Sequence, residues 1–204
     1  MQEELPLLRA ISLKRRLRRD ELPAGTGLDE STVDAVLRVA VESGNVELVR
    51  DRLSLTATGR ERLAELLDAE RVGLDSEGLL AAYHDFGEHN SAFKQLVTDW
   101  QLIGGTQPND HTDAEYDAAI IDRLAELHDR FDPLLQRIAA LAPRVGLYRS
   151  RFAVALQRVQ AGDHSWLAHP LGDSYHTVWF ELHEDLISLC GLTRKAEAEA
   201  GRAG

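Results

Sequence analysis

The sequence predicts a mainly α-helical chain built from two modules of different composition. Apolar residues recur at steps of three and four over most of its length, which is the spacing of amphipathic helices. The first 82 residues contain no Phe, Tyr, Trp, His or Cys, and the five Phe, four Tyr, three Trp, eight His and single Cys all follow. We therefore expect a first domain over 1–72, a second over 73–192 and a flexible tail over 193–204.

Charge is spread unevenly between the two modules. The chain has 204 residues, 44% of them hydrophobic, and a formal net charge of -11. Residues 1–72 hold 12 Lys and Arg against 14 Asp and Glu, whereas residues 73–204 hold 11 against 20. The second module should repel polyanions and anionic membranes, so only the first could approach nucleic acid.

The sequence also predicts where the chain resides. The single cysteine, Cys190, excludes an internal disulfide framework and fits a reducing cytosol. The N-terminus has no cationic segment followed by an apolar run, and no stretch is long enough to cross a bilayer. We expect a cytoplasmic protein without membrane contact.

Three helices are expected to open the chain. The first covers 6–19, with an apolar stripe formed by Leu5, Leu8, Ile11, Leu13 and Leu17. A short second helix over 20–26 ends at Gly27, a residue suited to left-handed helix ends. Asp29 stands at the cap position of the third helix, which ends at Gly44.

The pattern then changes to the alternation of a β-hairpin. The alternating apolar positions are Val46, Leu48, Leu53 and Leu55, with Arg50 before a turn at 51–52. Thr56 begins a fourth helix whose inward residues are Leu63, Leu66 and Leu67. Three helices, a two-stranded wing and a further helix predict a winged helix-turn-helix.

Short motifs in this module resemble the MarR-like winged-helix regulators over about residues 5–70. They are Thr26-Gly27-Leu28, Ser31-Thr32-Val33, Leu37, Gly44-Asn45-Val46 and Leu55-Thr56-x-x-Gly59-Arg60-x-Arg62-Leu63. The resemblance implies a winged-helix fold that binds double-stranded DNA as a homodimer. Winged helices also serve as protein-interaction modules, so that alternative stays open.

The third helix is the one expected to enter the major groove. The residues expected to contact DNA are Ser31, Thr32, Asp34, Ala35 and Arg38 on this helix, with Arg50 and Arg52 at the wing tip. Arg38 can read guanine, and Asp34 can accept a hydrogen bond from cytosine N4.

Negative charge on the same helix opposes this interface. Glu30, Asp34 and Glu42 would face phosphates and lower the affinity for DNA. Compensating cations are expected from Arg50, Arg52, Arg60, Arg62 and the cluster from Lys14 to Arg19. The acidic helix favours the alternative function, a winged-helix docking module in a regulatory subunit of an enzyme complex.

The second module is expected to be an antiparallel helical bundle. Its long amphipathic helices are expected over 75–103, 112–143, 145–162 and 173–190, separated by loops over 104–111 and 163–172. Apolar stripes on these helices place the aromatic side chains toward the interior.

Aromatic and titratable side chains of this bundle predict a small-molecule pocket. The expected lining residues are Tyr83, Trp100, His128, Tyr148, Arg149, His176, Trp179 and His183. Aromatic walls with a few polar groups are usual in such pockets, and histidines would make the site sensitive to pH. Each histidine taken alone can instead be a core-edge residue bonded to the backbone or to a nearby glutamate.

Asp85 and His89 lie four residues apart and share a helix face. The segment Tyr83-His84-Asp85-Phe86-Gly87-Glu88-His89-Asn90 resembles the Asp-x-x-x-His segment in the helical effector domain of GntR-type regulators. That resemblance implies a divalent metal, held with histidines from later helices. Phe152 stands where the family places its next histidine, so His169 or His176 would have to complete the set Asp85, His89 and His176.

No catalytic signature is present. The sequence lacks a His-Glu-x-x-His motif, a phosphate-binding glycine loop and a nucleophile elbow. We expect a ligand-responsive, dimeric transcriptional regulator rather than an enzyme, with no cofactor beyond the metal that the resemblance implies. A metal-dependent enzyme using Asp85, His89, His176 and His183 is a third alternative.

Overall fold

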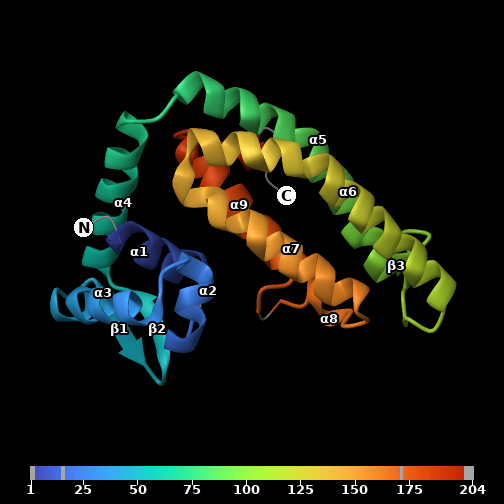
Figure 1. Ribbon diagram of the computed structural model, residues 1–204, viewed down its shortest axis with the longest axis horizontal. Helices are drawn as coiled ribbons and strands as arrows, with labels where there is room; N and C mark the ends of the chain where they lie inside the picture. Colours follow the sequence, from blue (N-terminus) through green and yellow to red (C-terminus); the bar gives the residue numbers. More distant parts are fainter. Residues whose placement is uncertain (1–2, 15–16, 171, 200–204) are drawn as a thin grey trace. The chain divides into compact units, whose positions relative to one another are not determined.

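The computed structural model describes residues 3–14, 17–170 and 172–199 (Figure 1). Within these ranges the chain is mainly helical, with one small antiparallel β-hairpin and a second pair of two-residue strands. The chain divides into two compact units, Met1–Leu74 and Asp75–Gly204. The predicted domain boundary, between 72 and 73, lies just before the observed one.

Unit 1 is built around an aliphatic core in which leucine is the commonest residue. Its elements are α1 (Glu4–Leu13), η1 (Arg19–Glu21), α2 (Leu22–Thr26), α3 (Glu30–Glu42), β1 (Val46–Val49), β2 (Arg52–Leu55) and α4 (Ala57–Val72). Helix α1 contacts α2, α3, α4 and β2, and its buried residues are Leu7, Leu8, Ala10 and Ile11. The first helix ends at Leu13 rather than at the predicted residue 19, and Arg15 and Arg16 of the predicted basic cluster lie outside the described residues.

Local sequence explains where α3 and α4 begin. Asp29 caps α3 by accepting a hydrogen bond of 3.0 Å from the Thr32 N–H, and Thr56 caps α4 by accepting one of 3.0 Å from the Gly59 N–H. A Cβ atom at position 59 would lie 1.9 Å from the backbone oxygen of Asn45. Only glycine allows the first turn of α4 to approach the chain before β1 so closely.

The hairpin turns one residue earlier than predicted. Its register pairs Val46 with Leu55 and Val49 with Arg52, so the turn consists of Arg50 and Asp51. Both turn residues have positive φ values, 50° and 64°, as a type I′ turn requires. Leu17 forms an isolated antiparallel bridge with Leu53, which adds a single residue to the edge of the hairpin.

Unit 2 consists mainly of long helices. Its elements are α5 (Ser76–Gln101), β3 (Leu102–Ile103), β4 (Gln107–Pro108), α6 (Ala114–Leu141), η2 (Pro143–Gly146), α7 (Leu147–Gln160), α8 (Ser165–Ala168), α9 (Tyr175–Leu189) and α10 (Arg194–Glu199). Helix α5 lies along α6, α6 contacts α7, and α9 contacts both α5 and α7 (Figure 1). The two predicted loops contain β4 and α8, which the apolar pattern does not indicate.

Aromatic rings from every long helix of unit 2 meet in its core. The rings that pack against one another there are Phe86, Phe93, Phe131, Phe152, Tyr175 and Trp179, all of them buried. Trp179 lies at the centre, with ring centroids 4.4 Å from Phe93 and 4.6 Å from Phe131. The predicted stripes on α5, α6 and α9 therefore face inward, because large apolar surfaces are removed from water there.

The C-terminal segment differs from the predicted flexible tail. Residues 194–199 form α10, and the Glu197 side chain is buried. The carboxylate of Glu197 accepts a hydrogen bond of 2.7 Å from the Tyr83 hydroxyl, and this contact ties α10 to α5. Residues 200–204 of the predicted tail lie outside the described residues.

Candidate functional site

The outward face of α3 carries most of the residues predicted to contact DNA. Ser31, Asp34, Ala35 and Arg38 are exposed, whereas Val33 on the other face is buried in the aliphatic core. The buried stripe fixes the rotation of the helix about its axis. The exposed side chains are therefore presented away from the core of unit 1.

At the start of α3, the predicted contact residues Ser31 and Thr32 already serve the helix cap. The Asp29 carboxylate accepts hydrogen bonds of 2.5 Å from the Ser31 hydroxyl and 2.8 Å from the Thr32 hydroxyl. The bond from Ser31, together with those from Thr32, lowers the pKa of Asp29 well below its usual range. Both hydroxyl hydrogens are committed, so these side chains offer their oxygen lone pairs to a partner.

Carboxylates pair with several of the cations on which DNA binding would depend. Arg19 forms an ion pair with Asp34, and Arg38 lies 3.6 Å from the Glu42 carboxylate on the next turn of α3. Arg62 on α4 donates to Glu4 at 2.9 Å. These pairs lower the positive potential that the sequence alone suggests for the surface around α3.

The hairpin tip combines charge with exposed apolar surface. Arg50 and Arg52, both predicted to contact DNA, are exposed at the turn. Leu48 and Val49 beside them are 59% and 54% exposed, and Val39 on α3 is 56% exposed. Exposed aliphatic side chains on both elements are a feature of protein-docking surfaces.

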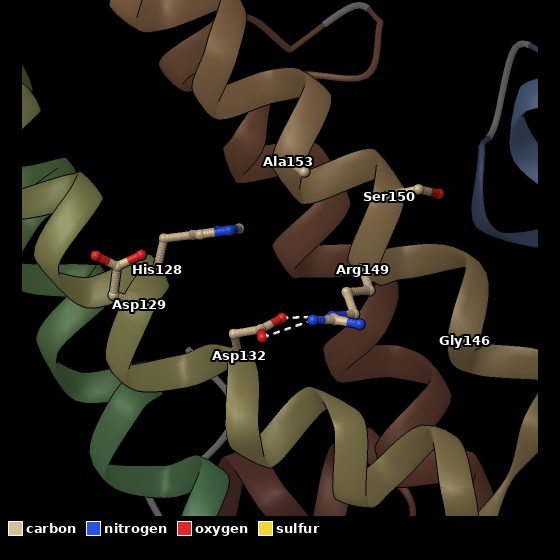
Figure 2. Close-up of a pocket in the computed structure, with 7 residues that line it drawn as sticks. All are labelled: His128, Asp129, Asp132, Gly146, Arg149, Ser150 and Ala153. Carbon is tan, nitrogen blue, oxygen red and sulfur yellow. Dashed lines mark hydrogen bonds and ion pairs between the residues drawn. The ribbon is translucent and has the colours of Figure 1, made fainter.

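In unit 2, the residues predicted to bind a ligand divide between two pockets. The first has a volume of about 560 Å³ between α6 and α7 and is lined by His128, Asp129, Asp132, Gly146, Arg149, Ser150 and Ala153 (Figure 2). Arg149 donates to both oxygens of Asp132, at 2.6 Å and 2.9 Å. His128 Nδ1 lies 3.2 Å from the buried Tyr175 hydroxyl, and burial lowers the pKa of His128.

The second pocket has a volume of about 580 Å³ on α5 and α9. Its lining residues are Leu80, Tyr83, His84, Phe86, Gly87, Glu88, Asn90, Ser91, His183 and Leu192. His183 Nε2 lies 3.4 Å from the Tyr83 hydroxyl, which also donates to Glu197. Burial lowers the pKa of His183 to about 4, so its imidazole is neutral at neutral pH.

The other predicted ligand residues lie outside both pockets. Trp100 stacks near His111, with ring centroids 4.4 Å apart, and Tyr148 donates a hydrogen bond of 2.6 Å to Asp185. Exposed His176 borders Phe93, and Trp179 forms the centre of the core. The structure therefore brings Tyr83 together with His183, and His128 with Arg149, instead of joining all eight residues in one cavity.

The three predicted metal ligands have separate surroundings. Asp85 forms an ion pair with Arg137, His89 lies against the ring of Phe131, and His176 lies beside Phe93. Among the residues that the structure describes, no group of three or more His, Cys, Asp or Glu side chains is arranged to hold a metal ion.

Two buried ionic clusters, which join α9 and the residues before it to α7 and η2, were not predicted. Arg151 donates to Glu181 at 2.7 Å and to Asp173 at 2.9 Å. Asp185 accepts hydrogen bonds from Arg144 at 3.1 Å and from Tyr148. Glu181 and Asp185 are four residues apart on α9 and interrupt its apolar pattern, which was the available signal.

Two further residues at the second pocket were also missed. Asn90 is not among the predicted ligand residues, and Glu197 lies in the predicted flexible tail. Asn90 Oδ1 accepts a hydrogen bond of 2.9 Å from the Trp179 indole, and Glu197 accepts from Tyr83. Neither partner could be identified from the sequence, since 89 and 114 residues separate the bonded groups.

Comparisons with protein families, curated proteins and solved structures gave no match for this chain. In the described part of the chain, no helix combines the length and apolar character required to cross a membrane.

Proposed function

We propose that this protein is a dimeric DNA-binding regulator that responds to a small molecule, with unit 1 binding the duplex and unit 2 the ligand. The observation that carries the proposal is the exposed face of α3, which lies between the short helix α2 and a β-hairpin. This element order supports a winged helix-turn-helix, as does the bridge from Leu17 to Leu53 at the hairpin edge. The resemblance of the same segment to MarR-like regulators agrees with it.

In this proposal α3 enters the major groove and the hairpin tip follows the adjacent backbone. Arg38 reads a guanine after leaving its ion pair with Glu42. That pair is weak, because it lies on the surface and its closest N–O distance is 3.6 Å. Arg50 and Arg52 contact phosphates. The pairing of Asp34 with Arg19 removes one of the negative charges that would oppose the duplex.

The helical unit supplies ligand binding and contributes to the dimer. The pocket on α5 and α9 combines aromatic and aliphatic walls with a few polar groups, as small-molecule sites do, whereas the pocket between α6 and α7 is lined mainly by charged and polar side chains. A ligand that binds one arrangement of the dimer better than another shifts the spacing of the two α3 helices, and DNA affinity changes with it.

A gel-shift assay with the DNA upstream of the chain's own gene tests this function. Arg38→Ala and Arg52→Ala should each weaken binding about tenfold or more, since a lost base or phosphate contact has that cost. Arg130→Ala removes the same charge from the exposed face of α6 and should leave DNA binding unchanged. Absence of binding, or binding that does not fall with added salt, would overturn the proposal.

A second candidate function is protein docking by unit 1. The exposed side chains of Val39, Leu48 and Val49, together with the carboxylates of α3, favour it. Purification of the chain from its own cells with a stoichiometric partner and no nucleic acid would support docking. Loss of that partner in Leu48→Asp, but not in Arg52→Ala, would assign the contact to the apolar surface.

A further inference from the structure

The pocket on α5 and α9 contains a largely buried amide whose nitrogen has no acceptor among the residues that the structure describes. Asn90 is only 7% exposed and lines this pocket. The indole of Trp179 can only donate, so its bond to Asn90 Oδ1 fixes the orientation of the amide. Among the described residues, Asn90 Nδ2 donates to no side chain or backbone acceptor. This nitrogen is not among the fully buried atoms that lack a hydrogen bond, so it opens into the pocket, where it can donate to a ligand that brings an acceptor.

The other end of the same pocket holds a carboxylate supplied by α10. Glu197 is 1% exposed and accepts the hydrogen bond from Tyr83, whose hydroxyl also lies 3.4 Å from His183 Nε2. Tyr83 and Asn90 are two helical turns apart on α5, about 10 Å along the axis. The wall around these polar groups includes the apolar side chains of Leu80, Phe86 and Leu192.

We propose that this pocket binds a small, largely apolar organic acid that carries a second hydrogen-bond acceptor. The carboxylate of the ligand accepts from Tyr83 at the position that Glu197 occupies, and its second acceptor receives the Asn90 amide. Glu197 is then an internal competitor, since two carboxylates at one buried hydroxyl repel each other. Binding of the acid displaces α10 from α5. The inference names the ligand class for the sensor half of the proposed function and therefore rests on it.

Calorimetric titration of the full chain tests the site with three probes of similar size: 4-acetylbenzoate, its methyl ester and benzylamine. The acid should bind saturably, the ester about tenfold more weakly because a hydrogen bond to a charged acceptor is lost, and the amine not at all. Preferential binding of benzylamine, or equal binding of acid and ester, would overturn the assignment of ligand class.

Variants locate the bound acid within the pocket. Tyr83→Phe keeps the ring, and Asn90→Asp keeps the acceptor for Trp179, so both preserve the packing of α5; each should weaken binding about tenfold. Glu197→Ala should strengthen it about tenfold, whereas Glu126→Ala, an exposed change on α6, should leave it unchanged. Unaltered affinity in Tyr83→Phe and Asn90→Asp would exclude this pocket, and unaltered or lower affinity in Glu197→Ala would exclude displacement of α10.

The same titration separates this inference from the proposed function. Binding of the acid is measured without DNA, so it succeeds or fails independently of α3. If the chain binds the acid saturably with the expected variant effects but does not bind DNA, the ligand site is supported and the proposed regulator function is rejected. If the chain binds DNA but none of the three probes, only the ligand site is rejected and the proposed regulator function stands.

Discussion

Arg151 and Glu181 form a buried ion pair between α7 and α9, with a hydrogen bond of 2.7 Å from the guanidinium to the carboxylate. The same guanidinium also donates to Asp173, and its Nε atom is buried without a hydrogen bond among the described residues. Removing such a pair from water has a large cost, which direct hydrogen bonds offset only when both partners are present. The pair therefore fixes how α7 and α9 face each other more than it adds stability.

Removing one member of this pair should be far more damaging than removing both. Glu181→Ala leaves the buried guanidinium of Arg151 short of its partner, and we expect unit 2 to lose about 3–5 kcal/mol of its free energy of unfolding. The double variant Arg151→Met with Glu181→Leu should recover most of that loss. Urea unfolding monitored by tryptophan fluorescence measures the free energy of unfolding of both variants. An equal loss in the single and the double variant would contradict the account.

Gly59 should be irreplaceable for steric reasons. In Gly59→Ala the new methyl group would collide with the Asn45 backbone oxygen, and we expect unit 1 to lose at least about 2 kcal/mol. Gly87→Ala is the matched control, since nothing lies within 4 Å of its added Cβ on α5. In Gly87→Ala the higher helix propensity of alanine should add about 0.5–1 kcal/mol to the free energy of unfolding of unit 2.

Two spectroscopic signals can assign these effects to the units. All three tryptophans lie in unit 2, whereas helical circular dichroism reports both units. Gly59→Ala should lower the circular dichroism transition while the tryptophan transition keeps its midpoint. Equal stability losses in Gly59→Ala and Gly87→Ala would show that the close approach to Asn45 does not restrict position 59.

The hairpin turn should become more stable when Asp51 is replaced by glycine. Asp51 has a φ of 64°, a region that glycine adopts without steric cost, so Asp51→Gly should raise the stability of unit 1 by up to about 1 kcal/mol. The change also removes a negative charge between Arg50 and Arg52 and should strengthen DNA binding. Asp68→Gly removes the same charge within α4 and should lower stability, because glycine disfavours helices. A destabilised Asp51→Gly would show that the turn conformation differs.

Stability of unit 2 should fall as pH drops from about 6.5 toward 4, where buried His183 and the half-buried His89 and His128 must acquire charge. Burial lowers the pKa of His183 from 6.5 to about 4 and also lowers those of His89 and His128. The unfolded chain then binds more protons than the folded chain in this window, so protonation favours unfolding. Stability from these groups is complete above the unfolded pKa and is lost as pH falls through the window.

The His183 contribution can be isolated by substitution. In His183→Gln the decrease in urea midpoint between about pH 7.5 and pH 5 should be smaller than in the parent chain. Arg137 and Arg149 lower the pKa values of Asp85 and Asp132, their paired carboxylates. The stability that these ion pairs contribute is therefore lost only at more acidic pH. An unchanged pH dependence in His183→Gln would contradict neutral burial of this imidazole.

The main secondary structure could be predicted because it depends on local signals. Asp29 and Thr56 begin α3 and α4 as expected, and the alternation after Val46 marks the hairpin. The inward stripe of α5 could be predicted for the same reason. Helix α10 could not, since its Ala-, Glu- and Lys-containing segment has no apolar stripe, and its buried carboxylate finds Tyr83 only after the chain has folded.

The candidate site could be predicted only in part, because a stripe shows which face of a helix is inward but not which neighbour it meets. Tyr83 and His183 line the same pocket, whereas Tyr148 faces Asp185 and Trp179 fills the core. The exposed residues of α3 could be derived from its buried stripe. The ion pair that joins Asp34 to Arg19 could not, since it depends on how η1 lies against α3.

Selection of bound duplexes from a random DNA pool by the full chain tests the central claim, DNA recognition by α3, most directly. We predict enrichment of an inverted repeat whose half-sites are centred about 10 base pairs apart, or a multiple of that distance, because each α3 of a symmetric dimer enters one major groove. Arg38→Ala should relax the preference at one base pair of each half-site. A pool that emerges without any enriched sequence would contradict the account.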